Sequence, residues 1–172
     1  SDVCSSDLRA AEVVAGLRRL RPQATPSDLY FFITTERGMG NNARAVAERK
    51  AASGRAPVFL YRLTWATPVL GGKLRTPHSL DMPMVFDNVA TSTSLVGGDT
   101  RVPQKVADAM SAAWIAFARS GSPNGSGLAE WPAYSPSRRA TMTFDEVSRS
   151  VDDPLRREHA LVAPYLVPPA IP

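Results

Sequence analysis

The sequence predicts an α/β chain in which several helices surround one or two strands of a sheet. Three observations predict it: apolar residues recur at helical spacing in the first third, the run Val58–Thr64 is rich in β-branched and aromatic residues, and a long amphipathic segment spans Pro103–Ser120. The chain has 172 residues, of which 44% are hydrophobic and 21% are charged. This length and composition are typical of about one soluble globular domain.

Short helices in series are predicted for the first third of the chain. The expected helices are 9–20, 28–38 with Ser27 as its N-cap, and 41–52 beginning at Asn41–Asn42. Pro22 would end the first helix, and Gly38 with Gly40 would end the second.

The run Val58–Thr64 is predicted to be a central strand, because it is apolar enough to be buried on both faces. The loop after it, Ala66–Met84, is punctuated by Pro and Gly and is long enough to indicate a function rather than a mere connection. Such a strand needs neighbours, which disfavours a self-contained small α/β domain without an active site. We therefore expect exposed apolar surface on Val58–Leu63 and on the long helix, and poor solubility.

The C-terminal half is expected to hold the most regular helix of the chain. Asp99 or Thr100 would cap it, and the Gly121–Gly127 turn would end it. Its apolar face is expected to comprise Val106, Met110, Ala113, Trp114 and Phe117. Beyond this turn, the sequence predicts a short strand at Thr141–Phe144 and a last helix from Asp153–Pro154 to a point before Pro164.

Charge and composition exclude several functional classes. The formal net charge is +4 with a pI near 9.6, but the arginines are scattered and no basic run is interleaved with aromatic residues, so a nucleic-acid partner is not expected. Cys4 is the only cysteine, so neither an internal disulfide nor a Cys-type zinc site is expected. No apolar stretch is long enough to span a bilayer, and no cofactor or metal is predicted. Oligomeric state and localisation stay open.

The first eight residues, Ser1–Leu8 (SDVCSSDL), differ in character from the helical pattern that follows. This string resembles the in-frame translation of a sequencing adapter, and a disordered native terminus is the alternative. On the adapter interpretation the protein sequence proper begins at Arg9, and Cys4 carries no functional information.

Two histidines are the candidates for proton transfer, because imidazole titrates near neutral pH. His78 lies in the Pro- and Gly-framed loop beyond the predicted buried strand, where the carboxyl end of a sheet would present it. His159 lies among charged residues on what we expect to be a surface helix, and we assign it no function. A packed or surface histidine without function is the alternative for His78 as well.

The acidic and aromatic residues yield no further catalytic assignment. Glu36, Asp87, Asp99, Asp145 and Asp152–Asp153 all lie at turns or helix starts, where carboxylates are favoured as caps. Trp65, Trp114, Phe117 and Trp131 are expected in the core. For Tyr30, Phe31 and Phe32 we expect packing of a helix face, with a place in a pocket wall as the alternative.

Three segments, read in order, resemble the C-terminal part of type-B carboxylesterases, a family that includes para-nitrobenzyl-esterase-like bacterial enzymes and the cholinesterases. These segments are PVFLYRLTW…GGKLRTPHSLDMPMVF (Pro57–Phe86), AAWIAFARSGSPN (Ala112–Asn124) and WPAYSPSRRATMTFD (Trp131–Asp145). The similarity runs from about Arg9 to Leu166. It implies that residues 9–172 form the C-terminal portion of an α/β-hydrolase domain, with helices and one or two strands of its central sheet.

The resemblance implies a Ser-His-acid esterase in the intact parent, acting on a small-molecule ester, with His78 as the catalytic histidine. Asp81 stands where the family usually has Glu, and it is expected to anchor the loop or act beside the site, with a plain N-cap as the alternative. No G-x-S-x-G elbow, oxyanion loop or triad acid is found in these residues, so this chain is expected to be inactive alone. A non-catalytic, cholinesterase-like binding or adhesion protein is the alternative function.

Overall fold

The computed structural model describes residues 2–125 and 127–165, and the side chains from Arg9 onward. The chain forms two compact units, Ser1–Arg49 with Pro154–Pro172, and Lys50–Asp153. One boundary falls inside a helix and the other lies directly before Pro154. Composition reveals neither boundary, because no Gly- or Ser-rich linker marks them. Among the described residues, no helix is both long and apolar enough to cross a membrane.

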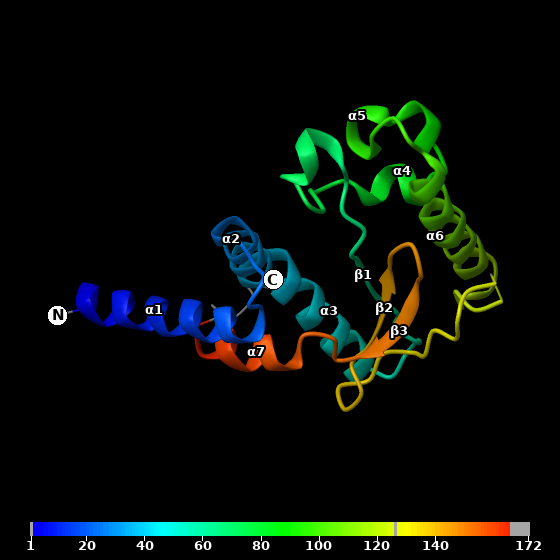
Figure 1. Ribbon diagram of the computed structural model, residues 1–172. Coiled ribbons are helices and arrows are strands. Elements are labelled where there is room, and N and C mark those ends of the chain that lie inside the picture. The colour runs from blue at the N-terminus through cyan, green and yellow to red at the C-terminus, as the bar shows by residue number, and fades with distance from the viewer. Residues whose placement is uncertain (1, 126, 166–172) are drawn as a thin grey trace. The chain divides into compact units, whose positions relative to one another are not determined.

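The first unit is entirely helical (Figure 1). Its elements are α1 (Asp2–Leu20), α2 (Pro26–Thr35), the π-helical turn η1 (Glu36–Gly40), α3 (Asn41–Ala52), α7 (Arg156–Val162) and the 3-10 turn η4 (Ala163–Tyr165). Helices from the two ends of the sequence share one core, which comprises Leu17, Leu29, Phe32, Leu155 and Val162. The last helix, α7, begins slightly later than predicted and ends before Pro164 as predicted, and Pro164 lies in the 3-10 turn η4 that follows it.

The N-cap predicted for the second helix is wrong. Thr25, not Ser27, caps α2: its hydroxyl accepts from the Asp28 backbone N–H at 3.2 Å, and the Asp28 carboxylate accepts from the Thr25 N–H at 2.9 Å. Pro26 occupies the first turn, where its missing N–H costs nothing. This reciprocal capping box fixes the helix start two residues earlier than expected.

The expected break at Gly38 and Gly40 is also wrong. Instead of ending, the helical chain continues through the π-helical turn η1 directly into α3. Glycine weakens a helix without forbidding it, and packing decides the outcome here.

Helix α1 begins before the predicted first residue. The expected helix spans 9–20, whereas the helical backbone runs from Asp2 to Leu20. Ser1 lies outside the described residues. The adapter interpretation of Ser1–Leu8 is untouched by this continuity and stays a prediction.

The second unit contains a three-stranded sheet in the order β1-β2-β3 (Figure 1). Strands β1 (Leu60–Leu63) and β2 (Ala140–Phe144) are parallel, and β3 (Arg149–Asp152) is antiparallel to β2. The most buried strand is β2, whereas β1 is half-buried and has one partner within the described residues. The central position predicted for Val58–Thr64 therefore belongs, in this sheet, to the predicted Thr141–Phe144 strand.

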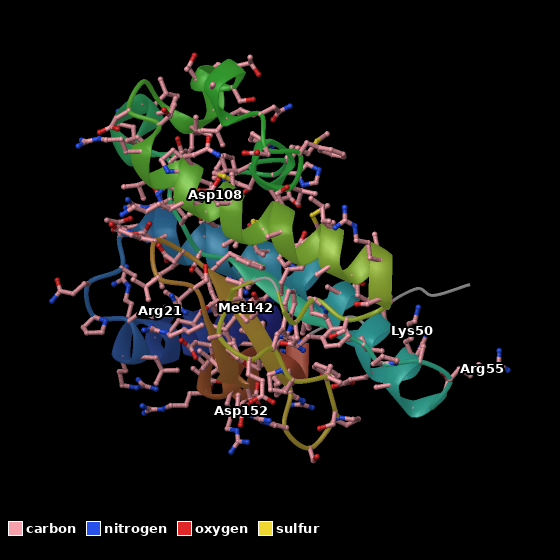
Figure 2. The ribbon with its side chains drawn as sticks, turned by 90° about the vertical axis from the view of Figure 1, so that its right-hand side faces the viewer. Arg21, Lys50, Arg55, Asp108, Met142 and Asp152 are labelled. Carbon is pink, nitrogen blue, oxygen red and sulfur yellow. The ribbon has the colours of Figure 1, made fainter. Side chains whose placement is uncertain are left out.

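The connection from β1 to β2 carries the rest of the unit. It includes η2 (Val69–Gly72), α4 (Asp81–Val85), η3 (Val89–Thr91), α5 (Thr93–Val96) and α6 (Arg101–Ser120). The Ala66–Met84 segment, expected as a plain loop, thus contains a 3-10 turn and the start of α4. Figure 2 shows α6 crossing the sheet, with Met142 of β2 in the core and Asp108 on the helix. Parallel strands require such a crossover.

Helix α6 begins close to the predicted position. Thr100 is its N-cap residue without a side-chain cap, while the Asp99 carboxylate accepts from the Arg101 N–H at 3.1 Å. Gly121 ends the helix in the left-handed region, at φ 76°, where a side chain would be strained.

The apolar face of α6 is only partly buried. Val106, Met110 and Ala113 are in the core, whereas Phe117, expected in the core, is 48% exposed. Trp65 and Trp131 are buried as predicted. The exposed apolar surface expected on the long helix is therefore present, at Ile115 and Phe117, whereas Val58–Leu63, where it was also expected, is half-buried.

Replacing Thr25 by Ala should lower the free energy of unfolding of the first unit by about 1 kcal/mol, because α2 loses its N-cap. Urea titration followed by circular dichroism measures this change. Ser27→Ala is the matched control, and it should have a smaller effect. Equal effects of the two variants would contradict the assignment of the cap to Thr25.

Candidate active site

His78 lies on the surface of the second unit, in the turn that precedes α4. The turn closes with a hydrogen bond from the Leu80 N–H to the Pro77 carbonyl at 3.2 Å, and Ser79 has a positive φ of 70°. The imidazole is exposed and forms no hydrogen bond with any residue that the structure describes. A free, accessible ring nitrogen is what a general base needs before a substrate arrives.

The segment before His78 is tethered to the end of β1. The Thr76 hydroxyl donates to the Trp65 carbonyl at 2.9 Å, and the Thr67 N–H donates to the Arg75 carbonyl at 2.8 Å. Trp65 follows β1 by two residues. These bonds hold the histidine turn beside the carboxyl end of a parallel strand, where α/β sheets bind their ligands.

The segment after His78 is tethered to β1 itself. Tyr61 donates its hydroxyl to Oδ2 of Asp81 at 3.0 Å. Leu80, not Asp81, is the N-cap residue of α4 and makes no side-chain cap. The structure therefore favours the loop-anchoring interpretation of Asp81 over the N-cap alternative.

The Tyr61–Asp81 contact shifts the protonation of the tyrosine. Burial, and then the negative charge and hydrogen bond of Asp81, raise the pKa of Tyr61 from 10.0 to about 12. The hydroxyl consequently stays protonated, and remains a donor, throughout the neutral range.

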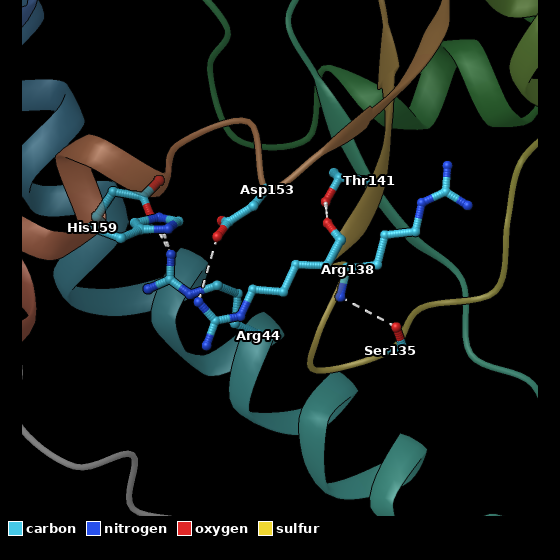
Figure 3. Close-up of polar contacts among 8 residues, drawn as sticks. Arg44, Ser135, Arg138, Thr141, Asp153 and His159 are labelled. Atoms are coloured by element: carbon cyan, nitrogen blue, oxygen red, sulfur yellow. Dashed lines mark hydrogen bonds and ion pairs between the residues drawn. The ribbon is translucent and has the colours of Figure 1, made fainter.

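A second polar cluster lies in the first unit, where sequence reasoning expected only a cap and a surface histidine. Glu36 has a side chain only 1% exposed, and its Oε2 lies 3.0 Å from Arg44 Nη1 and 2.8 Å from His159 Nε2. Arg44 Nη1 also contacts His159 Nε2. Figure 3 shows Arg44 of α3 and His159 of α7 turned toward one another. The buried carboxylate of Glu36 thus joins η1, α3 and α7.

Gly40 packs directly against that cluster. A Cβ built on Gly40 would lie 2.9 Å from the Glu36 carboxylate, so the π-helical turn brings the backbone against the buried acid. Gly40 is the local signal that sequence reasoning assigned instead to a helix end. His159 lies more than a hundred residues away in the sequence, and nothing local points to it.

The remaining acids bind side-chain partners, and two of them also take the expected capping role. Asp87 accepts from Gln104 Nε2 at 2.6 Å, Asp145 from Thr64 Oγ1 at 2.8 Å, Asp152 pairs with Arg138 at 2.7 Å, and Asp153 with Arg139 at 3.5 Å (Figure 3). Two of these acids also bind a backbone N–H as expected: Asp99 accepts from Arg101 at 3.1 Å at the start of α6, and Asp145 from Glu146 at 2.8 Å in a turn. The hydrogen bonds to Arg101 lower the pKa of Asp99 to about 2. None of these carboxylates forms a hydrogen bond or an ion pair with His78.

The three consecutive aromatic residues Tyr30–Phe32 differ in burial. Phe32 is buried in the core of the first unit, beneath the Arg21 guanidinium at 4.6 Å from the ring centroid, whereas Tyr30 and Phe31 are exposed. Within the described residues, no group of three His, Cys, Asp or Glu side chains is placed to hold a metal ion.

The Carboxylesterase family model matches residues 23–162. The chain belongs to this family. It is 32% identical over 111 residues to the para-nitrobenzyl esterase of Bacillus subtilis, covering 64% of this chain and 22% of that protein. It is also 32% identical over 121 residues to the phenmedipham hydrolase of Pseudarthrobacter oxydans, covering 68% of this chain and 24% of that protein.

Solved carboxylesterases share the fold of this member. The chain superposes on a carboxylesterase of Geobacillus stearothermophilus with a TM-score of 0.69 and 35% identity, over 85% of this chain and 31% of that one. An esterase from Clostridium hathewayi gives a TM-score of 0.67 with 27% identity, over 91% and 30% of the two chains. The chain thus spans about a quarter of the curated relatives and a third of these structures. The resemblance to type-B carboxylesterases and the α/β-hydrolase fold class are confirmed.

A late tyrosine ionisation is expected on alkaline titration. Because the folded pKa of Tyr61 is about 12 and its ordinary value is 10.0, the folded state binds this proton more tightly than the unfolded state. The stability contributed by this group is fully present below pH 10 and falls as the pH rises toward 12. Ultraviolet titration of the four tyrosines should show a step near pH 12 that Tyr61→Phe lacks. A titration that is the same with and without Tyr61 would contradict the assignment.

Replacing Glu36 by Ala should lower the free energy of unfolding of the first unit by about 3 kcal/mol, because the partly buried Arg44 guanidinium then loses its counter-charge. Chemical denaturation measures the loss. The control is Glu12→Ala, which removes an exposed acid of α1 and should change stability little. If both variants are equally stable, the cluster does not support the packing of η1, α3 and α7.

Proposed function

We propose that this chain is the histidine-bearing part of a serine carboxylesterase, with His78 as the general base, and that it is inactive without the rest of the catalytic machinery. The observation that carries the proposal is the place of His78: an exposed imidazole in a turn tethered to the carboxyl end of β1, within a sequence of the Carboxylesterase family. Family membership supports ester hydrolysis as the reaction class, and the tethered turn supports His78 as the general base.

The chemistry follows from acyl transfer. Neutral His78 would take the proton of a serine hydroxyl as that oxygen attacks the ester carbonyl, and then deliver the proton to the departing alkoxide. In deacylation the same nitrogen would take a proton from water and return it to the serine. An exposed Nε2 or Nδ1 suits both directions of transfer.

The serine and the triad acid would come from residues beyond these 172. The sequence contains no G-x-S-x-G elbow, and no carboxylate that the structure describes forms a hydrogen bond or an ion pair with His78. The sheet supports the same conclusion, because β1 is half-buried and has a partner on one edge only among the described strands. A parallel strand of an α/β-hydrolase sheet is normally paired and covered on both faces.

Exposed apolar side chains beside His78 support an organic ester as the substrate. Met82 of α4 is 55% exposed, and Phe86, the C-cap residue of this helix four residues later, is 69% exposed. Leu74, also exposed, precedes the histidine turn. Residues four apart share one face of a helix. An alkyl or aryl group of an ester has the chemistry to bind such a face.

The test is turnover of a short-chain aryl ester by two proteins, this chain and a version extended by the upstream coding sequence. The extended protein should hydrolyse the ester, and His78→Ala should lower its kcat by roughly 10⁴- to 10⁶-fold, as removal of a triad histidine does in serine hydrolases. His159→Gln is the control for loss of a histidine, and it should keep the kcat of the parent.

Three outcomes would contradict the proposal. Turnover by the 172-residue chain that His78→Ala abolishes would show that the chain is complete. Full activity of the extended His78→Ala variant would remove His78 from the mechanism. An extended protein with a substituted serine and no turnover would favour the non-catalytic binding protein.

A further inference from the structure

The histidine turn is held on both sides, and the two tethers differ in kind. Upstream, Thr76 and Thr67 use backbone carbonyls close to the turn. Downstream, the tether is a single side-chain pair, Tyr61 with Asp81, that joins the turn to the middle of a strand. A tether between side chains can be removed by one substitution without changing the backbone.

Tyr61 is a rigid end for such a tether. Its ring meets Trp114 edge to face at 4.9 Å between centroids, with planes at 82°, and Phe144 at 6.1 Å, with planes at 68°. Trp114 belongs to α6 and Phe144 to β2, so the ring of Tyr61 packs against both of these elements. Edge-to-face contacts of this kind restrict ring orientation. The hydroxyl position is therefore set by the core.

Asp81 is close enough to transmit that position to the histidine. It follows His78 by three residues, and the residues between them form a closed turn. Ser79, with φ 70°, adopts a backbone region that non-glycine residues rarely occupy, and the Met82 N–H donates to the Ser79 carbonyl at 3.1 Å. A strained turn persists only when its surroundings hold it. Downstream of His78, Leu80 is buried in the core, and the tyrosine hydroxyl supplies the nearest side-chain hydrogen bond.

We infer that Tyr61 is a positioning residue for His78: through its hydrogen bond to Asp81 it holds the histidine turn in the one arrangement that presents the imidazole beyond β1. The catalytic part of this inference rests on the proposed function, whereas the tether itself does not. The inference also predicts that phenylalanine cannot replace Tyr61 in this role, because phenylalanine fills the same space in the core but has no hydroxyl. The raised pKa of Tyr61, about 12, supports the inference, because the hydroxyl stays protonated, and so remains a donor, throughout the neutral range.

The first experiment measures the turn without using activity. Amide hydrogen exchange is followed by NMR in the 172-residue chain at Leu80 and Met82, whose N–H groups close the turn, and at Thr64, whose N–H bonds to β2. Tyr61→Phe should lower protection about tenfold at Leu80 and Met82, the effect of losing one hydrogen bond, and leave Thr64 unchanged. Asp81→Asn and the double variant should give the same loss, not twice the loss.

Two matched variants show which feature matters. Asp81→Glu keeps a carboxylate acceptor and should retain the protection of the turn. Thr64→Val removes a hydroxyl that donates to the Asp145 carboxylate at 2.8 Å, also beside β1 but away from the turn, and should leave Leu80 and Met82 unchanged. Unchanged protection in Tyr61→Phe would overturn the inference, and so would an equal loss at Thr64, which would indicate a general packing role.

The second experiment uses the extended esterase. Tyr61→Phe should lower kcat about tenfold with KM unchanged, because the ester still binds while the base is less often in place. Asp81→Glu should keep the kcat of the parent. A change in KM alone would overturn the positioning role. If the exchange result holds but His78→Ala leaves turnover intact, the proposed function fails while the tether stands.

Discussion

The parallel pairing of β1 with β2 is the constraint on which the second unit depends. Parallel strands cannot be joined by a hairpin, so the chain must travel back over the sheet between Leu63 and Ala140. The histidine turn, α4, α5 and α6 all belong to that return path. The buried face of α6 covers Met142 and Phe144 of β2, and the same helix supplies Trp114 against Tyr61. The core and the candidate site are therefore consequences of one pairing.

The two units use different physics to join distant parts of the chain. In the second unit, apolar packing and edge-to-face aromatic contacts hold β1. One hydrogen bond, from the Tyr61 hydroxyl to the Asp81 carboxylate, links this core to the histidine turn. In the first unit, a buried acid, Glu36, meets Arg44 and His159 from two other elements. A buried carboxylate persists only when it is paired and hydrogen-bonded, so this cluster restricts how η1, α3 and α7 can pack.

Local patterns predicted much of the fold. The apolar period located α6 to within two residues of its start, and the strand at Thr141–Phe144 and the helices near 9–20 and 41–52 were likewise predicted. Strand β3 (Arg149–Asp152) was not predicted, because its short polar sequence shows no alternation and only its pairing with β2 makes it a strand. The order of burial in the sheet was predicted wrongly for a related reason. Apolar content indicates how buried a strand can be, but its neighbours decide how buried it is.

By itself, the sequence determined the class of protein and the candidate base: the Pro57–Phe86 segment carries both the family resemblance and His78, and both are local patterns of residue type. Only the tertiary structure decided what surrounds these residues. Tyr61 meets Asp81 across a gap of twenty residues, and Glu36 meets His159 across more than a hundred. Contacts of this kind depend on how the elements pack, and no local periodicity encodes that packing.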